Sequence, residues 1–136
     1  RDRDVTGVQT CALPISGLAA DHRRATGETL TAAEIAARAA EGNAAARAAL
    51  DRHAERLARA TAAVINILDP EVIVLGGGLS NLPHLYDALP EIWPRWVFAP
   101  AVATRLRPPK HGDSSGVRGA AWLGRIAAPH PEKSAL

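Results

Sequence analysis

The sequence has few of the residues that build disulfides, redox sites or membrane spans. Cys11 is the only cysteine among its 136 residues, so neither a disulfide nor a cysteine-based metal site can form within the chain. No apolar run approaches the length of a membrane span, and no basic segment followed by an apolar core marks a secretory signal. We therefore expect a cytoplasmic protein.

Methionine is absent, even from position 1, which indicates a coding sequence that starts within a gene. The net charge is only +2, and the arginines are scattered among Glu and Asp. This pattern favours a solvated surface over nucleic-acid binding. The length suffices for one hydrophobic core, so a single lobe is expected.

The most informative motif joins an apolar run to three glycines. Residues 72–75, Val-Ile-Val-Leu, predict a strand covered on both faces, because three of the four are β-branched. Three residues without Cβ allow positive φ and let a ligand approach the main chain, and a capped helix after them would present free N–H groups. The predicted nucleotide-binding residues are Gly76, Gly77, Gly78, Ser80 and Asn81.

This motif also has a plain interpretation, a tight connection between strand and helix. It is not a Walker loop, because no Gly-Lys-Ser/Thr follows, and it lacks the Gly-x-Gly-x-x-Gly spacing of dinucleotide-binding proteins. A second tract, residues 110–123, strengthens the nucleotide interpretation, because it too joins an expected strand to a helix through spaced glycines. Its carboxylate, Asp113, could be a catalytic base, but a cap or turn role is favoured at a helix start.

The two tracts, residues 68–81 and 110–123, resemble the C-terminal signature of the ROK family of sugar kinases and repressors, most closely its bacterial fructokinase branch. The resemblance runs from about residue 17 to 123. Between the tracts, the residues that fall where a fructokinase-like sequence has its Leu-Tyr, Leu-Pro and Val-Phe pairs are Leu85, Tyr86, Leu89, Pro90 and Phe98.

The resemblance implies an α/β fold, here a partial C-terminal lobe of a ribonuclease-H-like, actin-type (hexokinase-like) ATPase. It implies ATP-dependent phosphorylation of a hexose, most fittingly fructose, with ATP and Mg²⁺, by a protein that is a homodimer when complete. The family's catalytic aspartate and zinc ligands would lie upstream of position 1, so no catalytic residue is expected in this chain and the fragment should be inactive. The alternative is a sugar-responsive repressor whose DNA-binding domain is missing.

The start of the chain departs from the family. Residues 5–15 resemble the translation of a sequencing-adapter oligonucleotide, although Val5, Val8 and Leu13 also suit an authentic amphipathic strand. We therefore expect a non-native leader at 1–16, the C-terminal lobe at 17–128 and a tail at 129–136.

Capping residues and prolines predict the helices. Thr31 and Glu34 form a capping box for a helix that ends at Gly42, and Asn43 caps a longer helix to about Leu68. Its expected apolar positions are Leu50, Ala54, Leu57, Thr61, Val64, Ile65 and Leu68.

Prolines divide the chain after the first glycine tract. Two short helices, 82–89 and 91–97, are expected around Pro90 and Pro94. A strand at 103–106 and a helix at 116–126 should follow. The residues of that helix available for packing are Val117, Ala120, Ala121 and Leu123.

Several other residues could carry chemistry but have simpler explanations. His111 is favoured as a loop residue, and His22 with its basic neighbours Arg23 and Arg24 as part of an exposed helix. His53 is expected at the polar border of its helix. For Trp93, Trp96 and Trp122, packing is favoured over a sugar platform.

Overall fold

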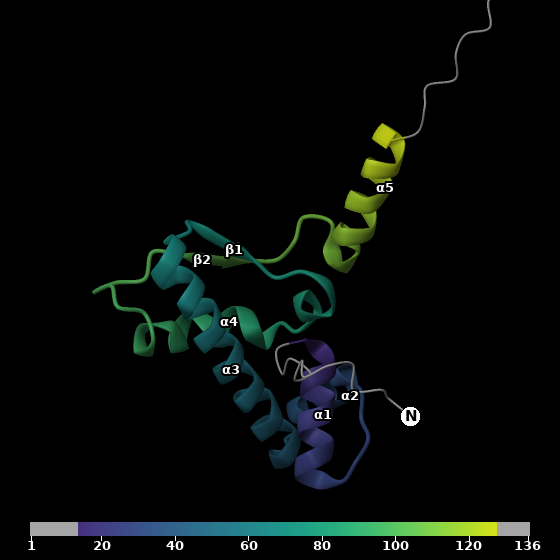
Figure 1. The fold of residues 1–136 in the computed structure, drawn as a ribbon. Coiled ribbons are helices and arrows are strands. Elements are labelled where there is room, and N and C mark those ends of the chain that lie inside the picture. Colours follow the sequence, from purple (N-terminus) through teal and green to yellow (C-terminus); the bar gives the residue numbers. More distant parts are fainter. Residues whose placement is uncertain (1–13, 128–136) are drawn as a thin grey trace, which may run out of the picture.

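The structure, a computed structural model, describes residues 14–127, apart from the side chains of 113, 115 and 124–127. Predictions for residues 1–13, with Cys11 among them, and for 129–136 lie outside this range. The elements follow the chain as α1 (Ile15–Thr26), α2 (Ala32–Ala40), α3 (Ala44–Leu68), β1 (Val72–Val74), η1 (Gly77–Asn81), α4 (His84–Ile92), η2 (Trp93–Arg95), β2 (Arg105–Arg107), η3 (Gly112–Ser114) and α5 (Ser115–Ala127). Helices α1 and α2 pack beside one half of α3, and the sheet with α4 lies at its other half (Figure 1). Within 14–127, no helix combines the length and the apolarity of a membrane span.

Side-chain caps start two of the helices as predicted. The Thr31 hydroxyl accepts a hydrogen bond from the Glu34 N–H at 3.3 Å, and the Glu34 carboxylate accepts one from the Thr31 N–H at 2.7 Å. Asn43 Oδ1 accepts a bond from the Ala46 N–H at 2.9 Å, and α3 ends at Leu68. Both helices are confirmed, because these caps satisfy N–H groups that have no partner inside the helix.

The buried face of α3 differs in part from the predicted stripe. Leu50, Leu57 and Ile65 are buried, but Val64 and Leu68 are 42% and 70% exposed, because the last turns of α3 extend past the described core. His53, expected at the polar border, is fully buried. His22, expected on an exposed helix, is also buried, although Arg23 and Arg24 beside it are exposed.

The sheet consists of two parallel strands in the described residues, with Ile73 of β1 opposite Leu106 of β2. Leu106 is buried in the core that includes α4, and Ile73 packs against that core. Val72 and Val74 point to the other face and are 39% and 54% exposed. The prediction of a strand covered on both faces is therefore wrong for this chain, since its described residues cover one face only.

The predicted break at Pro90 is also wrong. Helix α4 runs through Pro90 to Ile92, and η2 follows it with Pro94 in its first turn. Leu89 and Trp93, on either side of the expected break, are fully buried, so packing holds the helical path despite the hydrogen bond that Pro90 cannot donate. Trp93 also donates from Nε1 to the Thr61 hydroxyl at 2.8 Å, which confirms its role in packing.

The C-terminal elements lie where expected within two residues, but α5 does not pack as expected. Val117 and Leu123 are 74% and 69% exposed, and Ala120 and Ala121 are exposed too. Figure 1 shows why, since α5 extends away from the other helices. The side chains expected to pack, at 117, 120, 121 and 123, are therefore exposed to solvent.

Side-chain hydrogen bonds connect the end of α3 to the sheet. Asn66 donates from Nδ2 to the Trp96 carbonyl at 2.9 Å, and its Oδ1 accepts from the Phe98 N–H at 3.0 Å. The Thr104 hydroxyl donates to the Pro70 carbonyl at 2.8 Å, next to the start of both strands. These bonds fix the segment that leads from α4 back to β2.

A two-arginine ion pair joins α1 to α3. The buried Asp21 carboxylate accepts from Arg52 at 2.7 Å and from Arg56 at 2.8 Å. Burial raises the pKa of Asp21, but the hydrogen bonds from Arg56 and Arg52, with their charges, outweigh burial and hold that pKa below its usual value. The carboxylate is therefore ionised at neutral pH, and its charge is paired.

We expect Asp21→Asn to lower the free energy of unfolding at pH 7 by about 1–2 kcal/mol, since both arginines are partly solvated and the pair is worth less than a fully buried one. Because the folded pKa lies below the unfolded value of about 3.9, this contribution is complete above that value and is lost as pH falls through the folded pKa. Urea unfolding from pH 7 to pH 2 would measure it. As a control, Arg38→Gln breaks an exposed pair with Glu28 and should cost less than about 0.5 kcal/mol.

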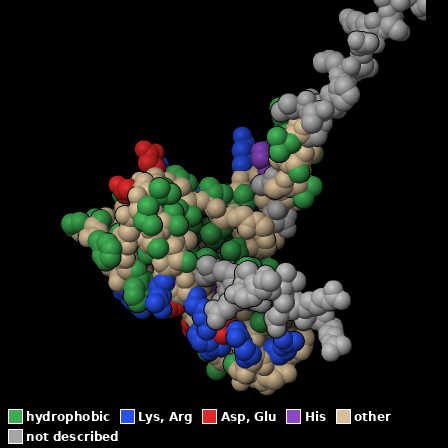
Figure 2. All heavy atoms as spheres, in the orientation of Figure 1, with side chains coloured by type: hydrophobic (Ala, Val, Ile, Leu, Met, Phe, Trp, Pro, Cys, Tyr) green, Lys and Arg blue, Asp and Glu red, His purple; other side chains and the backbone are tan. Residues whose placement is uncertain are grey.

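The exposed apolar side chains predict self-association of this polypeptide. Ile67 and Val74 are 80% and 54% exposed on the end of α3 and on β1, in the region where hydrophobic side chains reach the surface in Figure 2. Uncovered apolar surface of this kind favours association. Sedimentation velocity should show a concentration-dependent increase in mass that the double variant Ile67→Lys/Val74→Lys reduces. A chain that stays monomeric at every concentration would contradict this expectation.

Candidate functional site

The two glycine tracts of the sequence lie side by side in the structure. Strands β1 and β2 are parallel, so their carboxyl ends meet at one edge of the sheet. The bond from the Leu75 N–H to the Arg107 carbonyl, at 3.4 Å, extends the pairing to the start of the first tract. Beyond it η1 and η3 are in contact, and Figure 1 shows both connections on the side of the sheet where α5 begins. In open α/β sheets, this edge is where ligands bind.

The first tract presents open backbone. Gly76 has extended backbone and Gly77 has a φ of +58°, and both are exposed. A Cβ added to either would meet no atom within 4 Å. At Gly78 a Cβ would lie 2.9 Å from Ile15 Cδ1, so this glycine accommodates a side chain of α1. Gly76 and Gly77 thus leave room for a ligand, and Gly78 makes room for the protein itself.

The sequence suggested that Ser80 or Asn81 would cap the next helix, but neither residue does so. Helix α4 begins at His84 with Pro83 as its N-cap, and both residues lie in η1 instead. Within η1 the Ser80 hydroxyl donates to the Gly77 carbonyl at 2.7 Å, a local bond that competes with capping. The positive end of a following helix therefore does not lie directly beneath the glycines.

Sequence reasoning gave no role to Tyr86, which contacts the first tract. Its hydroxyl donates to the Ser80 carbonyl at 3.3 Å. The resemblance marked the Leu85-Tyr86 pair, but no periodicity signals a hydrogen bond between a helix residue and a turn six positions earlier. Only the folded arrangement, in which the turn lies against α4, brings the Tyr86 hydroxyl to the Ser80 carbonyl.

The second tract contributes another open glycine. Gly112 has a φ of +64°, and a Cβ there would meet nothing within 4 Å. The backbone of Asp113 lies in η3, a turn as predicted, while its side chain is outside the described residues. His111 is exposed in the preceding turn, as expected of a loop histidine.

The carboxylates with shifted pKa values do not suit acid–base catalysis. Hydrogen bonds from Thr31 lower the pKa of Glu34, and Asp21 is lowered as well, whereas a general base working near neutral pH needs a raised value. Both side chains already serve in a capping box and an ion pair. Among residues 14–127, no group of three or more His, Cys, Asp or Glu could hold a metal ion.

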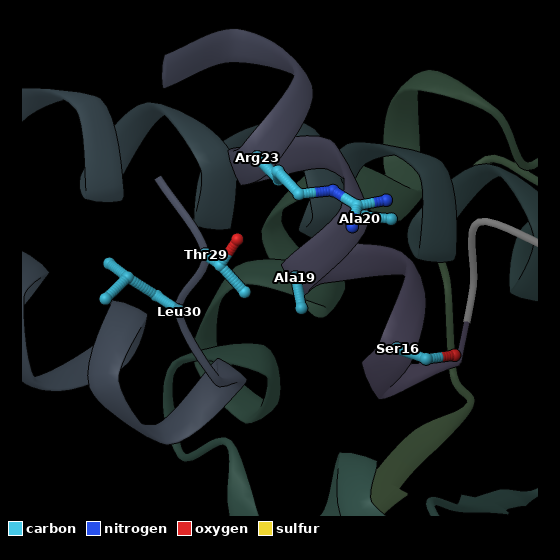
Figure 3. Close-up of a pocket in the computed structure, with 6 residues that line it drawn as sticks. All are labelled: Ser16, Ala19, Ala20, Arg23, Thr29 and Leu30. Carbon is cyan, nitrogen blue, oxygen red and sulfur yellow. The ribbon is translucent and has the colours of Figure 1, made fainter. Parts of the chain in front are cut away.

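A small hollow lies elsewhere on the molecule, between α1 and the segment before α2 (Figure 3). Its volume is about 190 Å³. It is lined by Ser16, Ala19, Ala20, Arg23, Thr29 and Leu30. Sites for drug-sized ligands measure about 300–1,000 Å³. The hollow is too small for a nucleotide and does not touch the glycine tracts.

The tryptophans do not form a common sugar platform. Trp93 is buried, Trp96 lies under the Arg59 guanidinium at 4.6 Å from the ring centroid, and Trp122 is exposed on α5. Trp93 and Trp96 follow α4, far along the chain from α5. Each already has a protein partner, since Trp93 donates to Thr61 and Trp96 donates to Glu55.

Comparison with known proteins shows which family model and which relatives this chain matches. A model described as "ROK family" matches residues 10–126. An N-acetyl-D-glucosamine kinase of Haemophilus influenzae is 43% identical over 102 residues, which are 75% of this chain and 34% of that protein. One from Photobacterium profundum is 45% identical over 97 residues, 71% of this chain and 32% of that protein. The chain thus spans about a third of the length of these relatives.

The fold is also found in a solved structure, a ROK family glucokinase from Streptomyces griseus in complex with glucose and AMPPNP. The TM-score is 0.64 with 21% identity, and the match covers 82% of this chain and 38% of the glucokinase. This confirms the predicted fold class, part of the actin-type ATPase fold.

Alanine substitutions should show which glycine of the first tract is needed for folding and which is not. We expect Gly78→Ala to destabilise the chain by about 1 kcal/mol, because its Cβ would press on Ile15. Gly76→Ala should be neutral, since its backbone is extended and the space is open. Urea unfolding measures both, and in a double-mutant cycle Ile15→Ala should remove the extra cost of Gly78→Ala. Equal stability of the Gly76 and Gly78 variants would refute this assignment.

Proposed function

Because the chain belongs to the ROK family, we propose that the protein of which it forms a part transfers a phosphoryl group from ATP to a hexose. The observation that carries the proposal is the meeting of two glycine tracts at the carboxyl edge of parallel strands. Phosphoryl transfer depends mainly on positioning a triphosphate, and bare backbone suits that role. The residues we assign to the nucleotide-binding turn are Gly76, Gly77, Gly78, Ser80 and Asn81, of which Gly76 and Gly77 have open space beside their backbone.

The hexose is best stated broadly. The relatives are named N-acetyl-D-glucosamine kinases, and the structural neighbour held glucose. These names support an aldohexose of that kind more than the fructose expected from the sequence, which stays a prediction. They also favour a kinase over the repressor alternative.

The groups that complete the reaction lie outside this chain in our proposal. A base for the sugar hydroxyl, the Mg²⁺ ligands and a possible zinc site would come from the remainder of the protein. Among the described carboxylates, Asp21 is already held by an ion pair and Glu34 by a capping box. When bound, Mg²⁺ would neutralise charge on the phosphates. A homodimer of the complete protein remains a prediction.

The test is a kinase assay on the full-length protein that contains this segment. With ATP and Mg²⁺, we expect phosphorylation of N-acetylglucosamine or glucose, with fructose as a third substrate to be compared. The 136-residue chain alone should give no turnover, since it presents one wall of the site. A full-length protein inactive on all three sugars would reject the proposal.

The variant Gly76→Ala tests whether Gly76 lies beside the bound nucleotide. Because it should not disturb folding, we expect it to raise the KM for ATP by about tenfold through the Cβ that meets the ligand, with little change in the KM for the hexose. An unchanged KM for ATP would remove Gly76 from the nucleotide site while leaving the kinase assignment in place.

A further inference from the structure

Two hydroxyl groups hold the first glycine tract, one from helix α4 and one from within the turn itself. The Tyr86 hydroxyl, on α4, donates to the Ser80 carbonyl at 3.3 Å, and the Ser80 hydroxyl donates to the Gly77 carbonyl at 2.7 Å. Tyr86 is half-buried and packs against the hydrophobic core, whereas Gly76 and Gly77 are exposed and have open space beside them. The exposed part of the turn is thus tied to a helix that packs in the core.

These bonds have an electrostatic consequence for the turn. A carbonyl oxygen carries partial negative charge and repels a phosphate, whereas backbone N–H groups attract it. Gly77 and Ser80 direct their carbonyls to protein hydroxyls instead. Both carbonyls already accept from protein hydroxyls and are therefore less available to face an anion, as a backbone cradle for a phosphate requires.

We propose that Tyr86 and Ser80 are positioning residues that hold the turn at 76–81 in the conformation that accepts the polyphosphate of a nucleoside triphosphate. The inference rests on the proposed function and extends it to residues beyond the glycines. Neither side chain needs to touch the phosphates. Both act through the Gly77 and Ser80 carbonyls.

The Tyr86 environment supports this role. Burial raises the pKa of the Tyr86 hydroxyl above its ordinary value, so the group keeps its proton and remains a donor across neutral and mildly alkaline pH. At 3.3 Å its bond is long for O–H···O, whereas the Ser80 bond is of ordinary length. Ser80 should therefore contribute more than Tyr86.

The test compares Tyr86→Phe and Ser80→Ala in the full-length protein. Loss of one hydrogen bond corresponds to roughly 2- to 10-fold in an equilibrium constant. We expect the KM for ATP to rise by that factor, more in Ser80→Ala than in Tyr86→Phe, while the KM for the hexose and kcat stay within about twofold. Amide hydrogen exchange of residues 78–82 should be faster in both variants, also in the 136-residue chain, a readout that needs no activity.

Thr104→Val is the matched control. Thr104 makes the same kind of bond, hydroxyl to carbonyl, with Pro70 at 2.8 Å, but at the opposite end of the strands. It should lower stability at least as much as Tyr86→Phe does, because its bond is shorter, and leave the KM for ATP and the exchange of 78–82 unchanged.

The outcomes separate this inference from the proposed function. If the wild type is active but Tyr86→Phe and Ser80→Ala behave like Thr104→Val, or raise both KM values equally, the positioning role is wrong and the kinase assignment stands. If the wild type phosphorylates no hexose yet binds AMPPNP, and the variants weaken that binding, the positioning role is upheld and the kinase assignment fails. A wild type that binds no AMPPNP overturns both.

Discussion

The parallel pairing of β1 with β2 is the constraint on which the candidate site depends. The glycine tracts are separated in sequence by α4 and η2, and only the shared direction of the two strands delivers them to one edge. Antiparallel strands would send the tracts to opposite ends of the sheet. The pairing is short, so the packing of Leu106 and the hydrogen bonds around Thr104 and Asn66 help to hold it.

Local chemistry made the starts of α2 and α3 predictable. Thr31 and Asn43 satisfy N–H groups within three residues of themselves, so their signals are complete in the sequence. The glycine tracts were recognisable for the same reason, since the absence of Cβ is a property of the residue. The sequence also indicated that the tracts belong together, through a family resemblance that the comparisons confirmed.

Features set by distant contacts could not be predicted. Pro90 lies in a helix because Leu89 and Trp93 are buried beside it. His53 is buried although charged residues, Arg52 and Glu55, lie close to it in sequence. The exposure of Val74 reflects the part of the fold this chain covers, about a third of its relatives' length, which no periodicity can show. Ser80 bonds to its own turn rather than capping a helix, and two equally local choices of this kind differ too little in energy to be ranked from sequence.

The two-point grip of Asn66 has a mechanical consequence. The amide holds the backbone on both sides of Val97, and Thr104 adds a third attachment at Pro70, so α3, the strands and the segment before β2 cannot shift independently. Any displacement of the end of α3 would therefore carry the two strands and the segment before β2 with it.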